Sequence, residues 1–196
     1  MSRIRDIQRQ FYNVYKEKIS IAEFEKWLYK TDDIENIYGY DFYFRLLDLD
    51  YREKYIKNKL ETLIRMEIPF GQFEQQRIVL LLEHIIAEEG DLVELLEQLY
   101  DDYCHGYSFL RFLGLTYITG IDTFPKLNQI DQWDKHEFER KREMLNSSKD
   151  KIIKEAKRLL AFFKNGKIKI TNENEYIDAR KEEDKVELHH IEKMFQ

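Results

Sequence analysis

The chain has 196 residues, of which 43% are hydrophobic and 36% are charged, and its formal net charge is −6. This length suits one domain or one domain with an appendage, and the apolar fraction can fill a hydrophobic core, so full disorder is excluded. We expect no transmembrane helix and no secretory signal, because charges interrupt every apolar run. An internal disulfide is excluded, because Cys104 is the only cysteine. We therefore expect a cytoplasmic protein.

Short amphipathic helices over an aromatic cluster are predicted for the first 55 residues. Apolar residues at three- and four-residue spacing predict a helix over residues 3–18. Ser20 and Glu23 form the capping-box pattern that begins the next helix. Five of the seven residues in 38–44 are aromatic. Such density predicts tightly packed rings, with an aromatic ligand pocket as the alternative.

Longer helices are predicted for the middle of the chain. One helix is expected over residues 51–66, and the most apolar one over residues 72–88 is the expected central helix. Gly90 is placed to end it. The next helix is expected over residues 91–105, because Asp91 and Glu94 resemble a capping box. The second and third of these helices should form an antiparallel hairpin, since their connection is short.

The following segment is predicted to be less regular. Residues 107–113 are apolar and indicate a short buried helix that ends at Gly114. Residues 115–125 contain a glycine and a proline, and they are expected to be the least regular part of the chain. Helices are then predicted over residues 129–146 and 149–164, and Asn165-Gly166 should end the second of them.

The sequence pattern changes after residue 166. Residues 167–171 alternate polar and apolar side chains, which predicts a strand, and residues 175–179 are placed to pair back with it. Residues 180–185 read as a solvated run of charges. Residues 186–195 are interpreted as a last strand or a short docking helix.

The fold class predicted from these elements is mainly α. We expect a multi-helix, bundle-like domain over residues 1–166. A small β-hairpin or irregular C-terminal extension, residues 167–196, is expected to pack on that domain.

Acidic residues are concentrated in the middle of the chain. The segment from Glu67 to Asp122 contains eleven acidic and two basic residues, a local net charge of −9. The segment from Glu139 to Lys169 is basic. A strongly acidic surface repels nucleic acid and attracts cationic proteins. The alternative is that these acids only solvate exposed helix faces.

A partner-binding surface is predicted from this charge pattern. The candidate partner-binding residues are Glu88, Glu89, Glu94, Glu97, Asp101 and Asp102. Their expected partner is a basic protein. No catalytic residue, metal or cofactor is expected, and membrane or nucleic-acid binding is disfavoured. The pattern does not indicate an oligomeric state.

Two alternative functions remain open at this stage. One is an enzyme of unknown class with a site near the aromatic cluster or the C-terminal histidines, where Glu187-x-His189-His190-x-Glu192 resembles a metal-binding arrangement. Cys104 and His105 do not form a catalytic dyad, because adjacent helical residues diverge by about 100°. The other is a regulatory or scaffold protein that contacts nucleic acid through residues 140–158.

Residues 20–60 carry a resemblance to known proteins. The matching stretches are Phe24-Glu-Lys-Trp27-Leu-Tyr29, Ile34-Glu-Asn-Ile37, Gly39 and Tyr43-Phe-Arg-Leu46-Leu47-Asp-Leu-Asp50-Tyr51. They resemble the opening of small bacterial proteins, some of which serve as immunity proteins for polymorphic toxins. The resemblance implies a toxin domain as the basic partner. An acidic face would complement it electrostatically, so we expect a non-catalytic, toxin-neutralising immunity protein.

Overall fold

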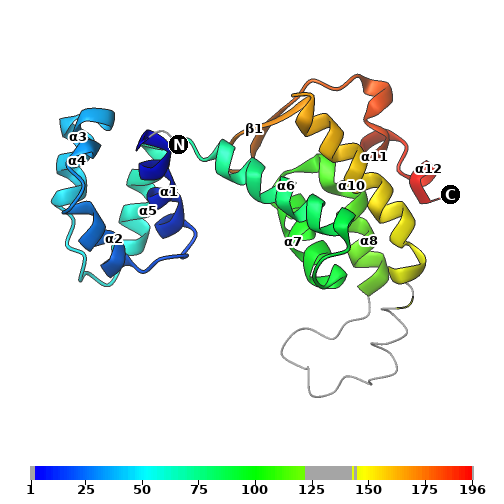
Figure 1. Ribbon diagram of the computed structural model, residues 1–196, viewed down its shortest axis with the longest axis horizontal. Helices are drawn as coiled ribbons and strands as arrows, with labels where there is room; N and C mark the ends of the chain where they lie inside the picture. The colour runs from blue at the N-terminus through cyan, green and yellow to red at the C-terminus, as the bar shows by residue number, and fades with distance from the viewer. Residues whose placement is uncertain (1–2, 122–142, 144, 196) are drawn as a thin grey trace, which may run out of the picture. The chain divides into compact units, whose positions relative to one another are not determined.

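Two compact units make up the chain in the computed structural model, Met1–Phe73 and Glu74–Gln196 (Figure 1). The structure describes residues 3–121, 143 and 145–195. The fold is mainly α with a small C-terminal hairpin, as the sequence predicted. The division between the units falls after residue 73, whereas the predicted domain boundary lay after residue 166. The hairpin belongs to the second unit.

Short helices form the first unit. They are α1 (Arg3–Tyr15), α2 (Ile21–Leu28), α3 (Asp33–Tyr38), α4 (Tyr40–Leu47) and α5 (Ile56–Glu67). The capping box at the start of α2 is confirmed, because Ser20 Oγ accepts from the Glu23 N–H while Glu23 Oε2 accepts from the Ser20 N–H at 2.8 Å. α5 begins five residues later than predicted.

The predicted aromatic cluster is the core of the first unit. Phe11 is fully buried, and its ring centroid lies 5.5 Å from that of Phe24 and 5.8 Å from that of Phe42. Not all aromatic side chains of residues 38–44 are buried in this core. Tyr40 and Phe44 lie on the outer side of α4, where 61% and 51% of their surface is exposed.

Helices of the second unit enclose a separate apolar core. α6 (Gly71–Ala87) spans the division after residue 73, and α7 (Leu92–Cys104) follows it in the predicted hairpin. The remaining elements are η1 (Ser108–Leu110), α8 (Arg111–Ile121), α10 (Lys149–Lys164), β1 (Ile168–Asn172), β2 (Glu175–Asp178), η3 (Glu182–Asp184), α11 (Val186–His189) and α12 (Glu192–Phe195). Leu82, Leu96 and Phe109 are fully buried in this core.

The predicted irregular segment is helical in its described part. α8 continues through Gly114 to Ile121, so the predicted helix end at Gly114 is wrong. The glycine has a packing reason instead, because a Cβ built there would lie 3.2 Å from Cβ of Tyr103 on α7. Gly114 thus allows α7 and α8 to approach closely. Residues 122–125 and nearly all of the helix predicted over 129–146 lie outside the described residues.

Replacing Gly114 with Ala is expected to lower the free energy of unfolding by about 1–3 kcal/mol, the usual cost of overpacking. Alanine would favour a helix by about 1 kcal/mol on propensity alone. The steric term should exceed this gain, because the nearest atom is the Cβ of Tyr103, which cannot rotate away. Urea unfolding measures the change. The penalty should shrink in a Tyr103→Gly background, which removes that Cβ. A stabilised G114A would contradict the close-approach model.

The C-terminal hairpin packs one face on the second core. β1 and β2 are antiparallel, with Ile170 opposite Tyr176 and Lys169 opposite Ile177. Ile168 and Ile170 are buried, whereas Lys169 is exposed, so the predicted alternation is confirmed. Residues 186–195, predicted as a strand or a docking helix, form α11 and α12. Among the described helices, none is long and apolar enough to cross a membrane.

Candidate functional site: the acidic surface of α6 and α7

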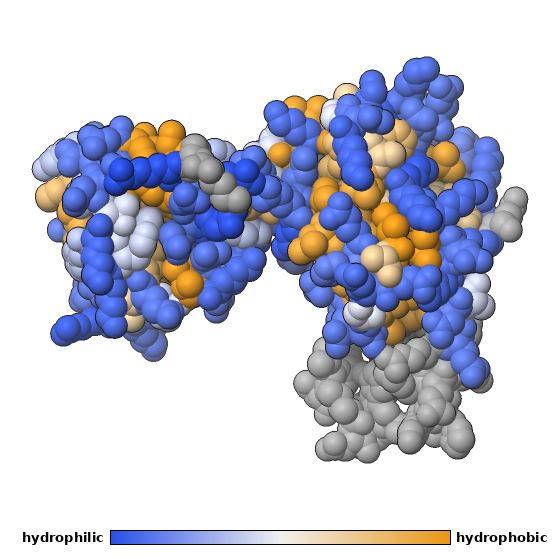
Figure 2. Space-filling view, viewed as in Figure 1, coloured by the Kyte–Doolittle hydropathy of each residue, from blue (hydrophilic) through white to orange (hydrophobic). Residues whose placement is uncertain are grey.

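Five of the six predicted partner-binding residues lie on one helical hairpin with solvent access. We call Glu88, Glu89, Glu94, Glu97 and Asp101 the acidic surface. The first two lie in the turn after α6, and the other three follow one another at spacings of three and four along α7. This spacing places them opposite the buried Leu95, Leu96 and Leu99. In Figure 2, hydrophilic residues surround a hydrophobic area on the visible face of the second unit.

Backbone geometry in the turn between α6 and α7 fixes the start of α7. Glu88 and Gly90 both have a positive φ, of 57° and 86°, which reverses the chain within a few residues. Asp91 then caps α7, and its Oδ1 accepts a hydrogen bond of 2.8 Å from the Val93 N–H. The helix therefore begins with a carboxylate that its dipole favours.

Among the described residues, most carboxylates of the acidic surface have no ion-pair partner. Glu88 pairs with Lys149 of α10. Glu97 accepts a hydrogen bond from the Tyr117 hydroxyl, and burial together with the Glu97 charge raises the pKa of Tyr117 above its usual range. Within the described part of the chain, Glu89, Glu94 and Asp101 form no ion pair. Their charges are available to a partner.

A small cleft borders the turn end of the acidic surface. It encloses about 220 Å³ and is lined by the apolar Ile85, Leu95 and Ile153 beside Glu88 and Lys149. Pockets for metabolites usually enclose about 300–1,000 Å³. The cleft is smaller than such pockets and has room for about one amino-acid side chain.

The sixth predicted residue, Asp102, is part of the core and not of the surface. Its side chain is buried and receives two hydrogen bonds from Arg77, of 2.9 Å to Oδ2 and 2.6 Å to Oδ1. Arg77 also holds the buried Glu74, with Nη2 2.8 Å from Oε2. Asp101 and Asp102 diverge by about 100° on α7, so one carboxylate faces solvent and the other faces α6.

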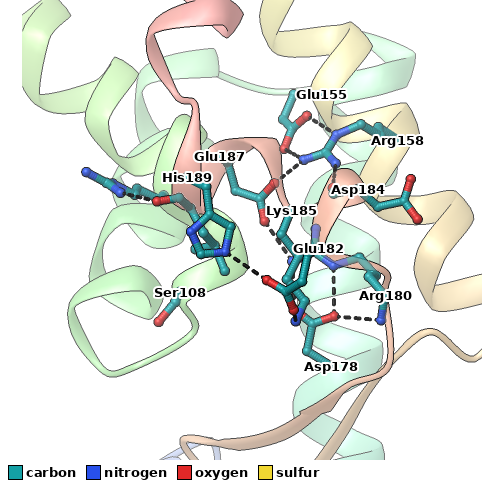
Figure 3. A network of polar contacts seen from close by, with 12 residues as sticks. Ser108, Glu155, Arg158, Asp178, Arg180, Glu182, Asp184, Lys185, Glu187 and His189 are labelled. Carbon is teal, nitrogen blue, oxygen red and sulfur yellow. Dashed lines mark hydrogen bonds and ion pairs between the residues drawn. The ribbon is translucent and has the colours of Figure 1, made fainter.

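A second group of buried charges joins the C-terminal segment to α10 (Figure 3). Arg158 binds Glu155 with Nε 2.6 Å from Oε2, and its Nη2 lies 2.6 Å from Oε2 of Glu187. Arg180 donates to the other oxygen of Glu187 at 2.7 Å and pairs with Asp178 on β2 at 2.8 Å. The solvated run predicted for residues 180–185 is wrong at its first position, because Arg180 is buried.

Arg158 and Arg180 offset the negative charges of the buried carboxylates in this network. Burial raises the pKa of Glu155, although hydrogen bonds from Arg158 oppose the rise. For Asp178, burial is outweighed by hydrogen bonds from Arg180, and the pKa of Asp178 is lowered. Both guanidinium groups also lie over the Phe162 ring, at 5.5 Å for Arg158 and 5.2 Å for Arg180. These contacts anchor the C-terminal segment.

Several residues considered for chemistry are placed elsewhere or are already engaged. Cys104 is exposed at the end of α7, and His105 Nδ1 lies 2.7 Å from the Asp101 carbonyl oxygen and not beside a nucleophile. Glu187, the first member of the metal-like pattern, is bound by arginines. His189 Nε2 lies 3.0 Å from Glu182 Oε2 at the surface. No group of three potential metal ligands occurs among the described residues.

The basic segment considered for nucleic acid is partly engaged within the protein. Residues 140–142 lie outside the described residues. Lys149 pairs with Glu88, and Arg158 is held by Glu155 and Glu187. Lys154 and Lys157 remain exposed on α10. The segment therefore offers fewer free cations than its sequence suggested.

Comparisons with known proteins found no relative of this chain. No protein-family model, curated protein or solved structure matches the chain.

Proposed function

We propose that this protein is a non-catalytic binding protein that recognises a basic protein through the acidic surface. The observation that carries the proposal is the row of exposed carboxylates on α7, where Glu94 and Asp101 have no ion-pair partner among the described residues. Unpaired surface charges of one sign speed the encounter with an oppositely charged partner and fix its orientation.

Charge distribution between the two units supports the proposal. The first unit contains thirteen basic and thirteen acidic residues, whereas the second contains nineteen basic and twenty-five acidic ones. The whole net charge of −6 therefore belongs to the unit that bears the acidic surface. The side-chain-sized cleft at the turn provides an apolar wall for the stem of a partner lysine or arginine.

The most concrete form of the proposal is a bacterial immunity protein that neutralises a toxin domain in the cytoplasm. The resemblance of residues 20–60 to proteins of this class supports it, and so does the acidity of the second unit. A toxin that cleaves nucleic acid presents a basic substrate-binding face. An acidic inhibitor can cover that face without performing any chemistry.

Reversing the charge of Glu94, Glu97 and Asp101 to Lys is expected to weaken the complex at least about tenfold while the protein stays folded. The partner to use is a basic nuclease domain of a polymorphic toxin, purified as a catalytically inactive variant. Isothermal titration calorimetry at low and high salt measures the affinity, and circular dichroism checks the fold. The loss should be larger at low salt, because screening weakens exposed charges.

A matched control separates the acidic surface from net charge alone. Glu35, Glu67 and Glu175 are also exposed, and changing them to Lys raises the net charge by the same amount, from −6 to zero. The control variant should bind nearly as well as the parent protein. Equal loss in both variants, or no loss in either, would contradict recognition through the acidic surface.

A further inference from the structure

Exposed aromatic side chains concentrate on the first unit. The large hydrophobic residues with substantial exposure in this unit are Ile4, Tyr29, Tyr40, Phe44, Tyr55 and Met66. In the described part of the second unit, only Leu80 and Ile177 are comparably exposed. These exposed apolar side chains lie outside the acidic surface. Their concentration on the first unit indicates a second interaction surface there.

Tyr40 and Phe44 form one patch on the outer side of α4. Their ring centroids lie 5.7 Å apart with an interplanar angle of 23°, so the rings are stacked. Leu47, one turn further along the same side, is half-buried. The opposite side of α4 buries Phe42 and Leu46 in the aromatic core. Anchors at positions i, i+4 and i+7 are the pattern by which a helix docks on another surface.

One flank of this patch carries opposite charges in a fixed order. Asp41 and Arg45 are exposed and lie one turn apart on the same flank of α4. Neither forms an ion pair within the residues that the structure describes. In an antiparallel pair of helices related by a twofold axis, the same flanks of the two helices meet. Asp41 of each copy would then face Arg45 of the other copy.

We propose that the outer face of α4 is a self-association surface, on which a second copy of this chain docks in antiparallel orientation. Stacked aromatic rings form the apolar centre, and the Asp41–Arg45 pairs occur twice around the twofold axis. The absence of net charge on the first unit allows two such units to approach without repulsion. This contact uses none of the residues of the acidic surface.

The area of the patch determines the expected affinity of the dimer. One helix of eight residues presents much less than the roughly 800 Å² per partner that stable complexes bury. The dimer should therefore be weak, with a Kd of roughly 10–500 µM. Such a dimer responds to local concentration and dissociates on dilution.

Sedimentation velocity of the full chain tests whether this surface mediates association. The samples should cover roughly 5–1,000 µM, a range that brackets the expected Kd. We expect a reversible shift from monomer to dimer. The double variant Tyr40→Ser/Phe44→Ser should raise the Kd at least about tenfold, because the apolar centre is lost. Tyr29→Ser/Tyr55→Ser removes two equally exposed rings and is the matched control, which should dimerise like the parent protein.

Charge exchange tests the antiparallel arrangement. Asp41→Arg alone should weaken the dimer, since it places two arginines opposite each other, and Arg45→Asp alone should do the same. The double exchange Asp41→Arg/Arg45→Asp should restore association. A parent protein that stays monomeric at every concentration would overturn the proposal, as would unchanged association in the Tyr40/Phe44 variant. Charge reversal of the acidic surface should leave the dimer intact.

Discussion

Replacing Arg77 with Ala is expected to lower the free energy of unfolding by about 3–5 kcal/mol, because it removes a cation that is hydrogen-bonded to two buried carboxylates. Glu74 is 1% exposed and Asp102 is 8% exposed, and Arg77 is hydrogen-bonded to both. Burial disfavours the charge of Arg77, yet hydrogen bonds and charges from the two carboxylates raise its pKa above the usual range. The guanidinium therefore stays charged between α6 and α7.

The stability lost in the Arg77→Ala variant should increase as the pH rises. Without the guanidinium, burial and mutual repulsion would disfavour the charged forms of the two carboxylates in the folded state. More of the buried pair must carry charge as the pH rises, so this penalty grows from acidic to neutral pH. The difference from the parent protein should hence be largest at neutral pH and smaller near pH 4.

Urea unfolding at several pH values measures this effect. The surface variant Lys59→Ala is the control, since it breaks the exposed pair between Lys59 and Glu53 and should change the midpoint little. The triple variant Glu74→Gln/Arg77→Met/Asp102→Asn removes all three charges and should recover part of the stability. An unchanged midpoint for Arg77→Ala would show that the buried network is dispensable.

Replacing Glu187 with Ala is expected to release the C-terminal segment from α10. The free energy that holds the segment on α10 should fall by about 3–5 kcal/mol. Glu187 is fully buried and its two oxygens accept from different arginines, Arg158 at 2.6 Å and Arg180 at 2.7 Å. Without it, Asp178 is the remaining ion-pair partner of Arg180 among the described residues. Detachment of the segment returns the guanidinium to water, so local unfolding is the easier response.

Hydrogen exchange read by mass spectrometry distinguishes the outcomes for Glu187. Amides of residues 180–195 should lose protection at least about tenfold, while α6 and α7 keep theirs. Glu183→Ala is the matched control, because Glu183 is exposed and contacts only Lys181 among the described residues. Protection that stays unchanged in the Glu187 variant would contradict the anchoring role of this network.

Local sequence signals predicted the elements that depend on local interactions. The capping box at Ser20, the α6–α7 hairpin and the β-hairpin after residue 166 all follow from side chains close together in the chain. The aromatic core was predicted from density alone. Which rings face outward was not, because the start of α4 at Tyr40 sets the rotation of the helix.

Long-range pairings account for the parts that could not be predicted. Arg77 meets Asp102 across 25 positions, and Arg158 meets Glu187 across 29. Charged residues normally indicate surface. Asp102 was therefore predicted to bind a partner and residues 140–158 were considered for nucleic acid, whereas Glu187 was considered as a metal ligand. Gly114 was interpreted as a helix end because glycine has that role more often than a role in close helix packing.

Cys104 offers a practical route into the acidic surface. It is the only cysteine, it is exposed, and it lies one helical turn from Asp101 at the end of α7. A thiol-reactive fluorophore attached to the unmodified sequence would therefore sit at the border of the acidic surface. Its emission would respond when a protein covers that region, so the natural chain already contains the attachment point for a binding reporter.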